Sequence, residues 1–185
     1  MIEVRWHGRG GQGVVTGSNL LARAAILEGK YAQHFPEFGP ERSGAPVRSY
    51  TRVSDQPIEL HTGVYSPDMV VVIDPTMARN PQEFTHGLKK GGVMVLNYAG
   101  DVREVSQLAK ELNVSIHVVN AHRISMEESG KKIYNVPMLA ALVKASGLVG
   151  LETVKSALMS RFSGDILEVN LRLLERAYRE VETLA

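Results

Sequence analysis

The chain has 185 residues, of which 44% are hydrophobic and 22% are charged. These fractions are close to the averages of globular proteins, so they exclude disordered, collagen-like and coiled-coil classes. Lys and Arg number 21 against 20 Asp and Glu, a net charge of +1 that lacks the basic excess of a nucleic-acid-binding domain. A typical domain size of about 150 residues predicts a single domain over residues 1–185.

The sequence contains no cysteine. This excludes disulfides, a cysteine nucleophile, and a zinc or iron–sulfur site ligated by cysteines of this chain. Uninterrupted apolar runs such as Met69–Ile73 are much shorter than the roughly 20 residues of a membrane span. The early acidic residue Glu3 argues against a secretion signal. We therefore expect a cytoplasmic protein that binds neither membranes nor nucleic acid.

Short segments rich in β-branched residues predict the strands of a sheet. Met69–Ile73 is apolar at every position, as expected for a strand that is covered on both faces. Val47–Leu60 follows a loop without an intervening helix and contains a Ser-Asp-Gln-Pro turn, so it is the candidate for antiparallel pairing. The predicted strands are Ile2–His7, Tyr31–Phe35, Val47–Val53, Met69–Ile73, Val93–Leu96 and Ser115–Val119.

Helical patterns alternate with these strands, and from about Ser125 onward no strand is expected. Ile166–Leu184 repeats its apolar residues at steps of four and three, which predicts a helix with one apolar face. Packing within the domain is the favoured interpretation of that face, and a subunit contact is the alternative. Asp101 and Glu104 have the spacing of a capping box. The other predicted helices are Val14–Glu28, Asp101–Leu112, Val136–Ala145 and Leu151–Arg161.

This alternation predicts a three-layer α/β/α fold with a mainly parallel or mixed sheet and a helical C-terminal part. Between the first strand and the first helix lies the glycine loop, Gly8-Arg9-Gly10-Gly11-Gln12-Gly13, which matches G-x-G-x-x-G in the required context. Glycines allow positive φ angles and close approach of a ligand, and the helix N-terminus offers free N–H groups. An anion such as phosphate is favoured there, with Arg9, Thr16 and Ser18 as candidate side-chain donors.

A dinucleotide-binding site is one alternative for the glycine loop. That fingerprint expects an acidic residue about 20 positions further on, at the end of the second strand. Here the second strand is predicted to end before Pro36, and Glu37 follows inside a loop. No Gly-Lys-Ser/Thr triplet of a Walker motif is present. In a further alternative the glycines only allow close packing of the helix on the strand.

The second loop, residues 35–47, contains three prolines, two glycines and two phenylalanines. It leaves the second strand at the sheet edge that also carries the glycine loop, where open α/β sheets bind ligands. A stiff recognition surface and a simple connector are both compatible with this composition.

Together the two loops resemble the gamma subunit of 2-oxoacid:ferredoxin oxidoreductases, and most of all its pyruvate (pyruvate synthase) branch. The resemblance rests on residues 8–16 and 38–47 and extends over nearly the whole chain. Arg52–Ile58, Tyr65–Asp68 and Asn135–Leu139 also match segments of the family, whereas Ala140 stands where relatives often have glycine.

The resemblance implies a multi-subunit enzyme that converts pyruvate, coenzyme A and oxidised ferredoxin to acetyl-CoA, CO2 and reduced ferredoxin. Thiamine diphosphate and the iron–sulfur clusters would lie in partner subunits (alpha, beta and delta). This chain would contribute to assembly and to part of the coenzyme A site, without a catalytic residue or a metal. The alternatives are a gamma subunit acting on 2-oxoglutarate or 2-oxoisovalerate, a stand-alone dinucleotide-binding oxidoreductase, and an interaction domain without a small-molecule ligand.

Coenzyme A carries a diphosphate and a ribose 3′-phosphate, which suit a glycine loop at a helix N-terminus. Among the other polar residues, His7 is expected to be a hydrogen-bonded structural histidine, and Asp74 is expected to cap the turn after its strand. None of the six histidines has metal-ligand spacing. The candidate coenzyme A contacts are Arg9, Gly10, Gly11, Gln12, Gly13, Thr16, Arg42 and Ser43.

Overall fold

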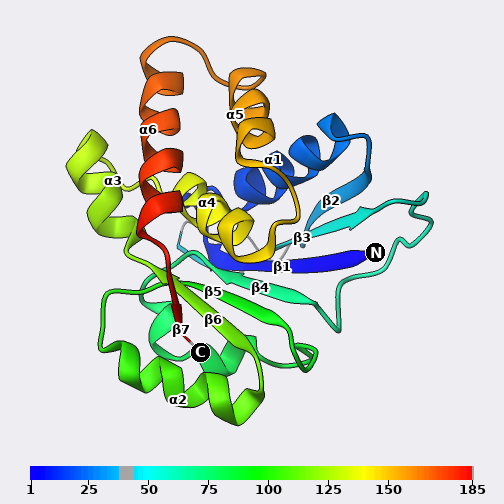
Figure 1. Cartoon of the computed structure of the whole chain (residues 1–185), viewed down its shortest axis with the longest axis vertical. Helices are drawn as coiled ribbons and strands as arrows, with labels where there is room; N and C mark the ends of the chain where they lie inside the picture. Colours follow the sequence, from blue (N-terminus) through cyan, green and yellow to red (C-terminus); the bar gives the residue numbers. More distant parts are fainter. Residues whose placement is uncertain (38–43, 185) are drawn as a thin grey trace.

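The computed structural model describes residues 1–37 and 44–184, without the side chains of Val102 and Glu104. In these residues a seven-stranded sheet has the order β2-β3-β1-β4-β5-β6-β7 (Figure 1). The strands are β1 (Ile2–Arg9), β2 (Tyr31–Glu37), β3 (Pro46–Ser54), β4 (Met69–Val72), β5 (Val93–Asn97), β6 (Ser115–Val119) and β7 (Glu182–Leu184).

The sheet is mixed, as predicted. β1, β4, β5 and β6 run parallel to one another, whereas the pairs β1–β3, β2–β3 and β6–β7 are antiparallel. The antiparallel segment expected within Val47–Leu60 is confirmed over the residues of β3. Because β3 separates β1 from β2, β2 is an edge strand.

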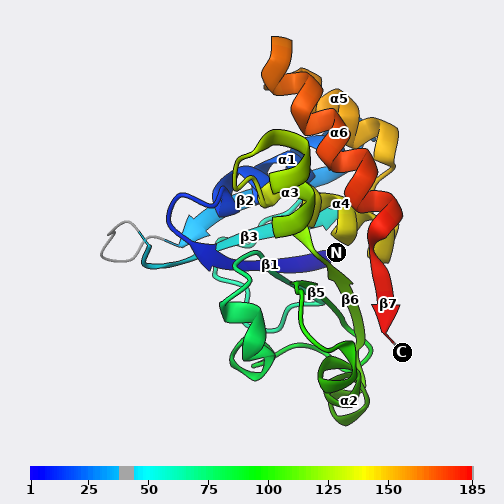
Figure 2. The ribbon, with the colours of Figure 1, turned by 90° about the vertical axis from the view of Figure 1, so that its left-hand side faces the viewer.

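Helices cover both faces of the sheet and confirm the three layers (Figure 2). Helix α4 is buried along most of its length between the sheet and α6, which accounts for its nearly continuous apolar sequence. One face carries α1 (Val14–Leu27), α3 (Ala121–Ser129), α4 (Asn135–Ser146), α5 (Leu151–Met159) and α6 (Gly164–Glu180). The other face carries α2 (Val102–Leu112) and the 3-10 helices η1 (Met77–Arg79) and η2 (Pro81–Phe84). None of the helices in the described residues has the length and apolarity to span a membrane.

Strand β4 joins two hydrophobic cores. Val71 packs into the larger core under α1 and α4, and Val70 and Val72 pack into the smaller core under α2. All three are fully buried, which confirms the prediction that this strand is covered on both faces. Each buried valine stabilises the fold by about 1.5–3 kcal/mol relative to an exposed one.

The C-terminal segment differs from the predicted single helix over Ile166–Leu184. Helix α6 ends at Glu180, Val181 is extended (φ −67°, ψ 132°), and β7 pairs antiparallel with β6. The expectation that no strand follows Ser125 is therefore wrong. Without β7, the backbone groups of β6 would lie unpaired at a sheet edge, and Leu184 would not reach the smaller core. The apolar face of α6 packs on the larger core, as favoured.

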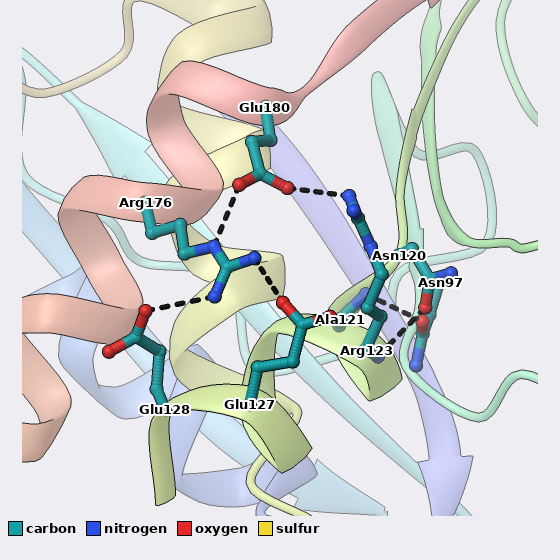
Figure 3. A network of polar contacts seen from close by, with 8 residues as sticks. All are labelled: Asn97, Asn120, Ala121, Arg123, Glu127, Glu128, Arg176 and Glu180. Atoms are coloured by element: carbon teal, nitrogen blue, oxygen red, sulfur yellow. Dashed lines mark hydrogen bonds and ion pairs between the residues drawn. The ribbon is translucent and has the colours of Figure 1, made fainter.

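Two arginines make four carboxylate contacts at the α3–α6 junction, and three of these contacts join the two helices (Figure 3). Arg176 donates to Glu180 Oε1 (2.7 Å), to Glu128 Oε1 (2.9 Å) and to Glu127. Arg123 donates to the other oxygen of Glu180 at 2.7 Å. The hydrogen bonds that Arg176 donates to Glu180, Glu127 and Glu128 raise the pKa of Arg176 above its ordinary value, so the guanidinium stays charged.

Candidate functional site

The glycine loop lies at the C-terminal end of β1, where the chain changes direction across the sheet. From β1 the chain passes through α1 on one face, whereas from β4 it passes through η1 and η2 on the other face (Figure 2). Open α/β sheets bind their ligands in the crevice at such a switch point. The topology thus places the glycine loop where a ligand site is expected.

Two glycines of the loop have different physical roles. Gly11 (φ +88°) and Gly13 (φ +76°) both adopt the left-handed region that favours glycine. A Cβ on Gly13 would lie 2.8 Å from Cγ of Asn135, so packing against α4 requires this glycine. A Cβ on Gly11 would meet no atom of the described residues within 4 Å. The packing alternative therefore accounts for Gly13, while the space beside Gly11 is open.

Gln12 and Asp74 hold the loop in shape. Gln12 Oε1 accepts a hydrogen bond from the backbone N–H of Arg9 (2.8 Å), and Gln12 Nε2 donates to Asp74 Oδ2. Asp74 Oδ1 accepts from the backbone N–H groups of Thr76 (2.9 Å) and Met77 (3.0 Å), which confirms its predicted capping role. Burial alone would raise the pKa of Asp74, but the hydrogen bonds from Thr76, Gln12 and Met77 lower it below its ordinary value. Asp74 is therefore ionised, and both ends of the Gln12 amide are used within the site.

Arg9 and Thr16 keep polar atoms near the surface of the loop. Arg9 Nη1 donates to the Gly44 carbonyl (3.2 Å), its Nε lies 3.7 Å from Asp74 Oδ1, and 40% of its side chain is exposed. Thr16 is half-buried in the first turn of α1. Ser18 is fully buried, with its hydroxyl 2.6 Å from Ser49 Oγ. The predicted anion-donor role of Ser18 is therefore wrong, because its side chain faces β3.

The end of the second loop lies beside the glycine loop, as their shared edge predicts. The backbone N–H of Gly10 donates to the carbonyl of Ala45 at 3.0 Å. Arg42 and Ser43, the candidate residues of the second loop, lie outside the described residues.

Glu37 is the last residue of β2, so the prediction that this strand ends at Phe35 is wrong. Pro36 fits within β2 because an edge strand does not need every N–H group. Glu37 lies two strands away from β1, where it accepts a hydrogen bond from the Tyr50 hydroxyl and pairs with Arg48 at 3.7 Å. A ribose-binding acid lies at the end of the strand next to β1, so Glu37 does not match the dinucleotide pattern.

His7 is a structural histidine, as expected. Arg5 Nε donates to His7 Nε2 at 3.0 Å, and the His7 ring lies 4.8 Å from that of Phe84. Burial lowers the pKa of His7 to about 3, and the nearby charges of Arg5 and Arg48 act in the same direction. His7 is therefore neutral and accepts the hydrogen bond from Arg5. Among the described residues, no cluster of three or more His, Asp or Glu could hold a metal ion.

Comparison with known proteins identifies the family. The family model for pyruvate ferredoxin/flavodoxin oxidoreductase matches residues 3–180. The chain belongs to this family. It is 45% identical over 182 residues to the "Pyruvate/ketoisovalerate oxidoreductases common subunit gamma" of Pyrococcus furiosus, covering 98% of each chain. It is 42% identical to the "Pyruvate synthase subunit PorC" of Methanothermobacter thermautotrophicus, covering 100% of this chain and 98% of that one.

A crystal structure of the pyruvate oxidoreductase subunit PORC from Thermotoga maritima has a TM-score of 0.87 and 39% identity to this chain. The alignment covers 100% of this chain and 98% of that one. The chain is thus the gamma subunit of a multi-subunit pyruvate/2-oxoacid:ferredoxin oxidoreductase, as the resemblance implied. The enzyme as a whole is catalytic, and this chain is one of its subunits.

Two asparagines of the gamma subunit shape this edge and were not predicted. Asn97 Oδ1 accepts from the Ala121 N–H at 3.0 Å, which joins β5 to α3 (Figure 3). Asn97 Nδ2 donates to the carbonyl of Ile73 (2.8 Å), the residue that follows β4. Asn97 directly follows the apolar run Val93–Leu96, so its place at the end of a strand could have been recognised from the sequence. Asn135 is buried against Gly13, and this contact between distant parts of the chain has no local signal.

Proposed function

We propose that the glycine loop of this gamma subunit forms part of the coenzyme A site in a pyruvate:ferredoxin oxidoreductase. The observation that carries the proposal is the open space beside Gly11, at the N-terminus of α1 and next to the partly exposed Arg9. Free N–H groups and the positive end of the helix dipole favour a diphosphate there. The assembled enzyme would convert pyruvate, coenzyme A and oxidised ferredoxin to acetyl-CoA, CO2 and reduced ferredoxin.

Each candidate residue has a distinct role in this proposal. Backbone N–H groups of Gly11 and Gly13 and the hydroxyl of Thr16 face the diphosphate, and Arg9 pairs with a phosphate oxygen. Gly10 lines the site and ties the glycine loop to the second loop, because its N–H donates to the Ala45 carbonyl. Gln12 is a positioning residue, because both ends of its amide are engaged by Arg9 and Asp74. Arg42 and Ser43 of the second loop complete the anion site.

The remaining chemistry belongs to other subunits. We propose that thiamine diphosphate and the iron–sulfur clusters lie in the alpha, beta and delta subunits, and that ferredoxin is reduced through the assembled enzyme. The chain has no cysteine, so it supplies no thiolate to a cluster. A relative that is a common subunit of pyruvate and ketoisovalerate oxidoreductases supports the view that other subunits select the 2-oxoacid. In this role residues 1–185 act as one domain.

The test is the Michaelis constant for coenzyme A in the assembled enzyme, with pyruvate-driven reduction of a viologen dye as the assay. Gly11→Asp places a negative charge in the open space, so we expect a KM for coenzyme A at least tenfold higher. Gly29→Asp is the matched control, because Gly29 has φ +77° and equally open surroundings at the other end of α1. Arg42→Ala should also raise this KM. An unchanged KM in both Gly11→Asp and Arg42→Ala would contradict the proposal.

A further inference from the structure

Three arginines lie on the sheet face opposite α1, close to the glycine loop. The register of β1 and β3 pairs Arg5 with Tyr50 and His7 with Arg48, so these side chains share one face. Arg9 follows His7 by two positions and lies on the same face, diagonal to Arg48. Diagonal neighbours in an antiparallel pair are about 7–8 Å apart, within reach of long side chains.

Carboxylates of the described residues do not neutralise this group of arginines. Arg5 is only 7% exposed, and its hydrogen bonds go to His7 Nε2 and to the carbonyls of Phe84 (3.0 Å) and His86 (2.7 Å). These acceptors are neutral, and burial lowers the pKa of Arg5. Buried charges in proteins are normally paired. Arg5 therefore adds a positive charge near Arg48, and none of its hydrogen-bond acceptors in the described residues is a carboxylate.

Among residues 1–37 and 44–184, the two surface arginines have only distant ion partners. Asp74 is 3.7 Å from Arg9 and already accepts hydrogen bonds from Thr76, Met77 and Gln12. Glu37 is 3.7 Å from Arg48 and accepts the Tyr50 hydroxyl. Three arginines thus share two nearby carboxylates among the described residues, and both carboxylates already accept hydrogen bonds from other groups.

Arg48 is the accessible member of this group. Its side chain is 56% exposed, and that of its cross-strand neighbour Glu37 is 47% exposed. Such an exposed pair contributes about 0–1 kcal/mol, so a doubly charged phosphate can displace Glu37 at little cost. Guanidinium groups bind phosphate oxygens through two parallel hydrogen bonds.

We propose that Arg48 binds a phosphomonoester, the ribose 3′-phosphate of the coenzyme A whose diphosphate lies on the glycine loop. This inference rests on the proposed function. The 3′-phosphate and the diphosphate belong to the same nucleotide, so their binding groups must be close neighbours. Arg9 and Arg48 meet this condition because they are diagonal neighbours on adjacent strands. Arg48 thereby distinguishes coenzyme A from ligands that carry only a diphosphate.

The test compares coenzyme A with 3′-dephospho-coenzyme A by isothermal titration of the assembled enzyme without pyruvate. Arg48→Ala should weaken coenzyme A at least tenfold and leave 3′-dephospho-coenzyme A unchanged. Arg48→Lys keeps the charge but loses the planar fork, and should give an intermediate affinity. Glu37→Gln removes the competing carboxylate and should tighten coenzyme A a fewfold. Arg103→Ala is the matched control, because Arg103 is exposed on α2 and pairs with Asp101.

The contrary results are distinct. Arg48 does not bind the 3′-phosphate if Arg48→Ala lowers the affinity for both ligands equally, or for neither ligand. The same conclusion follows if the subunits of this variant separate on a sizing column. Separation would assign Arg48 to a subunit interface instead. Gly11→Asp isolates the underlying proposal: normal binding of both ligands to that variant would overturn the loop assignment, whatever Arg48→Ala does.

Discussion

Arginines in two regions of the gamma subunit have opposite surroundings. Between α3 and α6, Arg176 is held by Glu127, Glu128 and Glu180. Beside the glycine loop, Arg9 and Arg48 lie 3.7 Å from their carboxylate partners in the described part of the chain, and about half of each side chain is exposed there. The first arrangement completes its hydrogen bonds inside the molecule and stabilises the fold, whereas we propose that the second provides donors for a ligand. The partners of an arginine therefore distinguish a structural role from a binding role better than its position in the sequence does.

The largest expected effect separates packing from binding within the glycine loop itself. Gly13→Val combines a positive φ with a Cβ 2.8 Å from Asn135 Cγ, so we expect a loss of about 3 kcal/mol or more in the free energy of unfolding. Gly11→Ala has the positive φ without the clash and should lose about 1–2 kcal/mol. Urea unfolding of the isolated chain measures both. Equal losses would show that the space beside Gly11 is closed.

The second prediction tests whether the buried His7, which lies near the positive charges of Arg5 and Arg48, is neutral in the folded chain. The pKa of His7 is about 3 in the folded chain and about 6.5 when unfolded, so the unfolded state takes up a proton between these values. The stability contributed by His7 is complete above pH 6.5 and falls as the pH drops toward 3. We expect a loss of up to about 3 kcal/mol between pH 6.5 and pH 4.

The measurement is the urea midpoint from pH 7.5 to pH 4 for the wild type and His7→Gln. The variant should lose less stability over this range, because glutamine still accepts a hydrogen bond but does not titrate. His61→Gln removes an exposed histidine and serves as the control. Parallel profiles for the wild type and His7→Gln would contradict the assignment of a neutral, buried His7.

The smallest expected effect concerns the α3–α6 network. Arg176→Ala removes hydrogen bonds to three carboxylates at a partly exposed site, so we expect a loss of about 1 kcal/mol that decreases with added salt. Arg172, whose nearest carboxylate contact is 3.4 Å, is the control and should lose less on substitution by alanine. Coenzyme A affinity should not change in either variant. A weaker coenzyme A affinity in Arg176→Ala would remove the distinction between the two regions.

Local sequence patterns predicted most of the sheet and much of its helical cover. β4 is apolar at each position, and β3 follows a loop without a helix, so the buried strand and the antiparallel strand were both recognisable from short windows. β7 was missed because its three residues continue a helical periodicity, and only the free edge of β6 makes them a strand. Glu37 was placed in a loop because Pro36 was taken as the end of the strand, although an edge strand tolerates proline.

The candidate site could be predicted only in part, because some of its contacts, like the pairing of β7, depend on tertiary packing. The glycine loop is a continuous motif, so its position and chemistry follow from adjacent residues. The contact of Gly13 with Asn135 and the shared face of Arg9 and Arg48 depend on tertiary packing and strand register. Ser18 shows the reverse case, since its spacing after the loop suggested an anion donor but its helical face is directed at β3.

The most direct measurement is a structure of the assembled enzyme with coenzyme A bound, by crystallography or electron cryomicroscopy. The account predicts diphosphate oxygens within hydrogen-bond distance of the Gly11 and Gly13 backbone N–H groups and of Arg9, with the 3′-phosphate at Arg48. Coenzyme A bound with its phosphates away from the glycine loop would contradict the account.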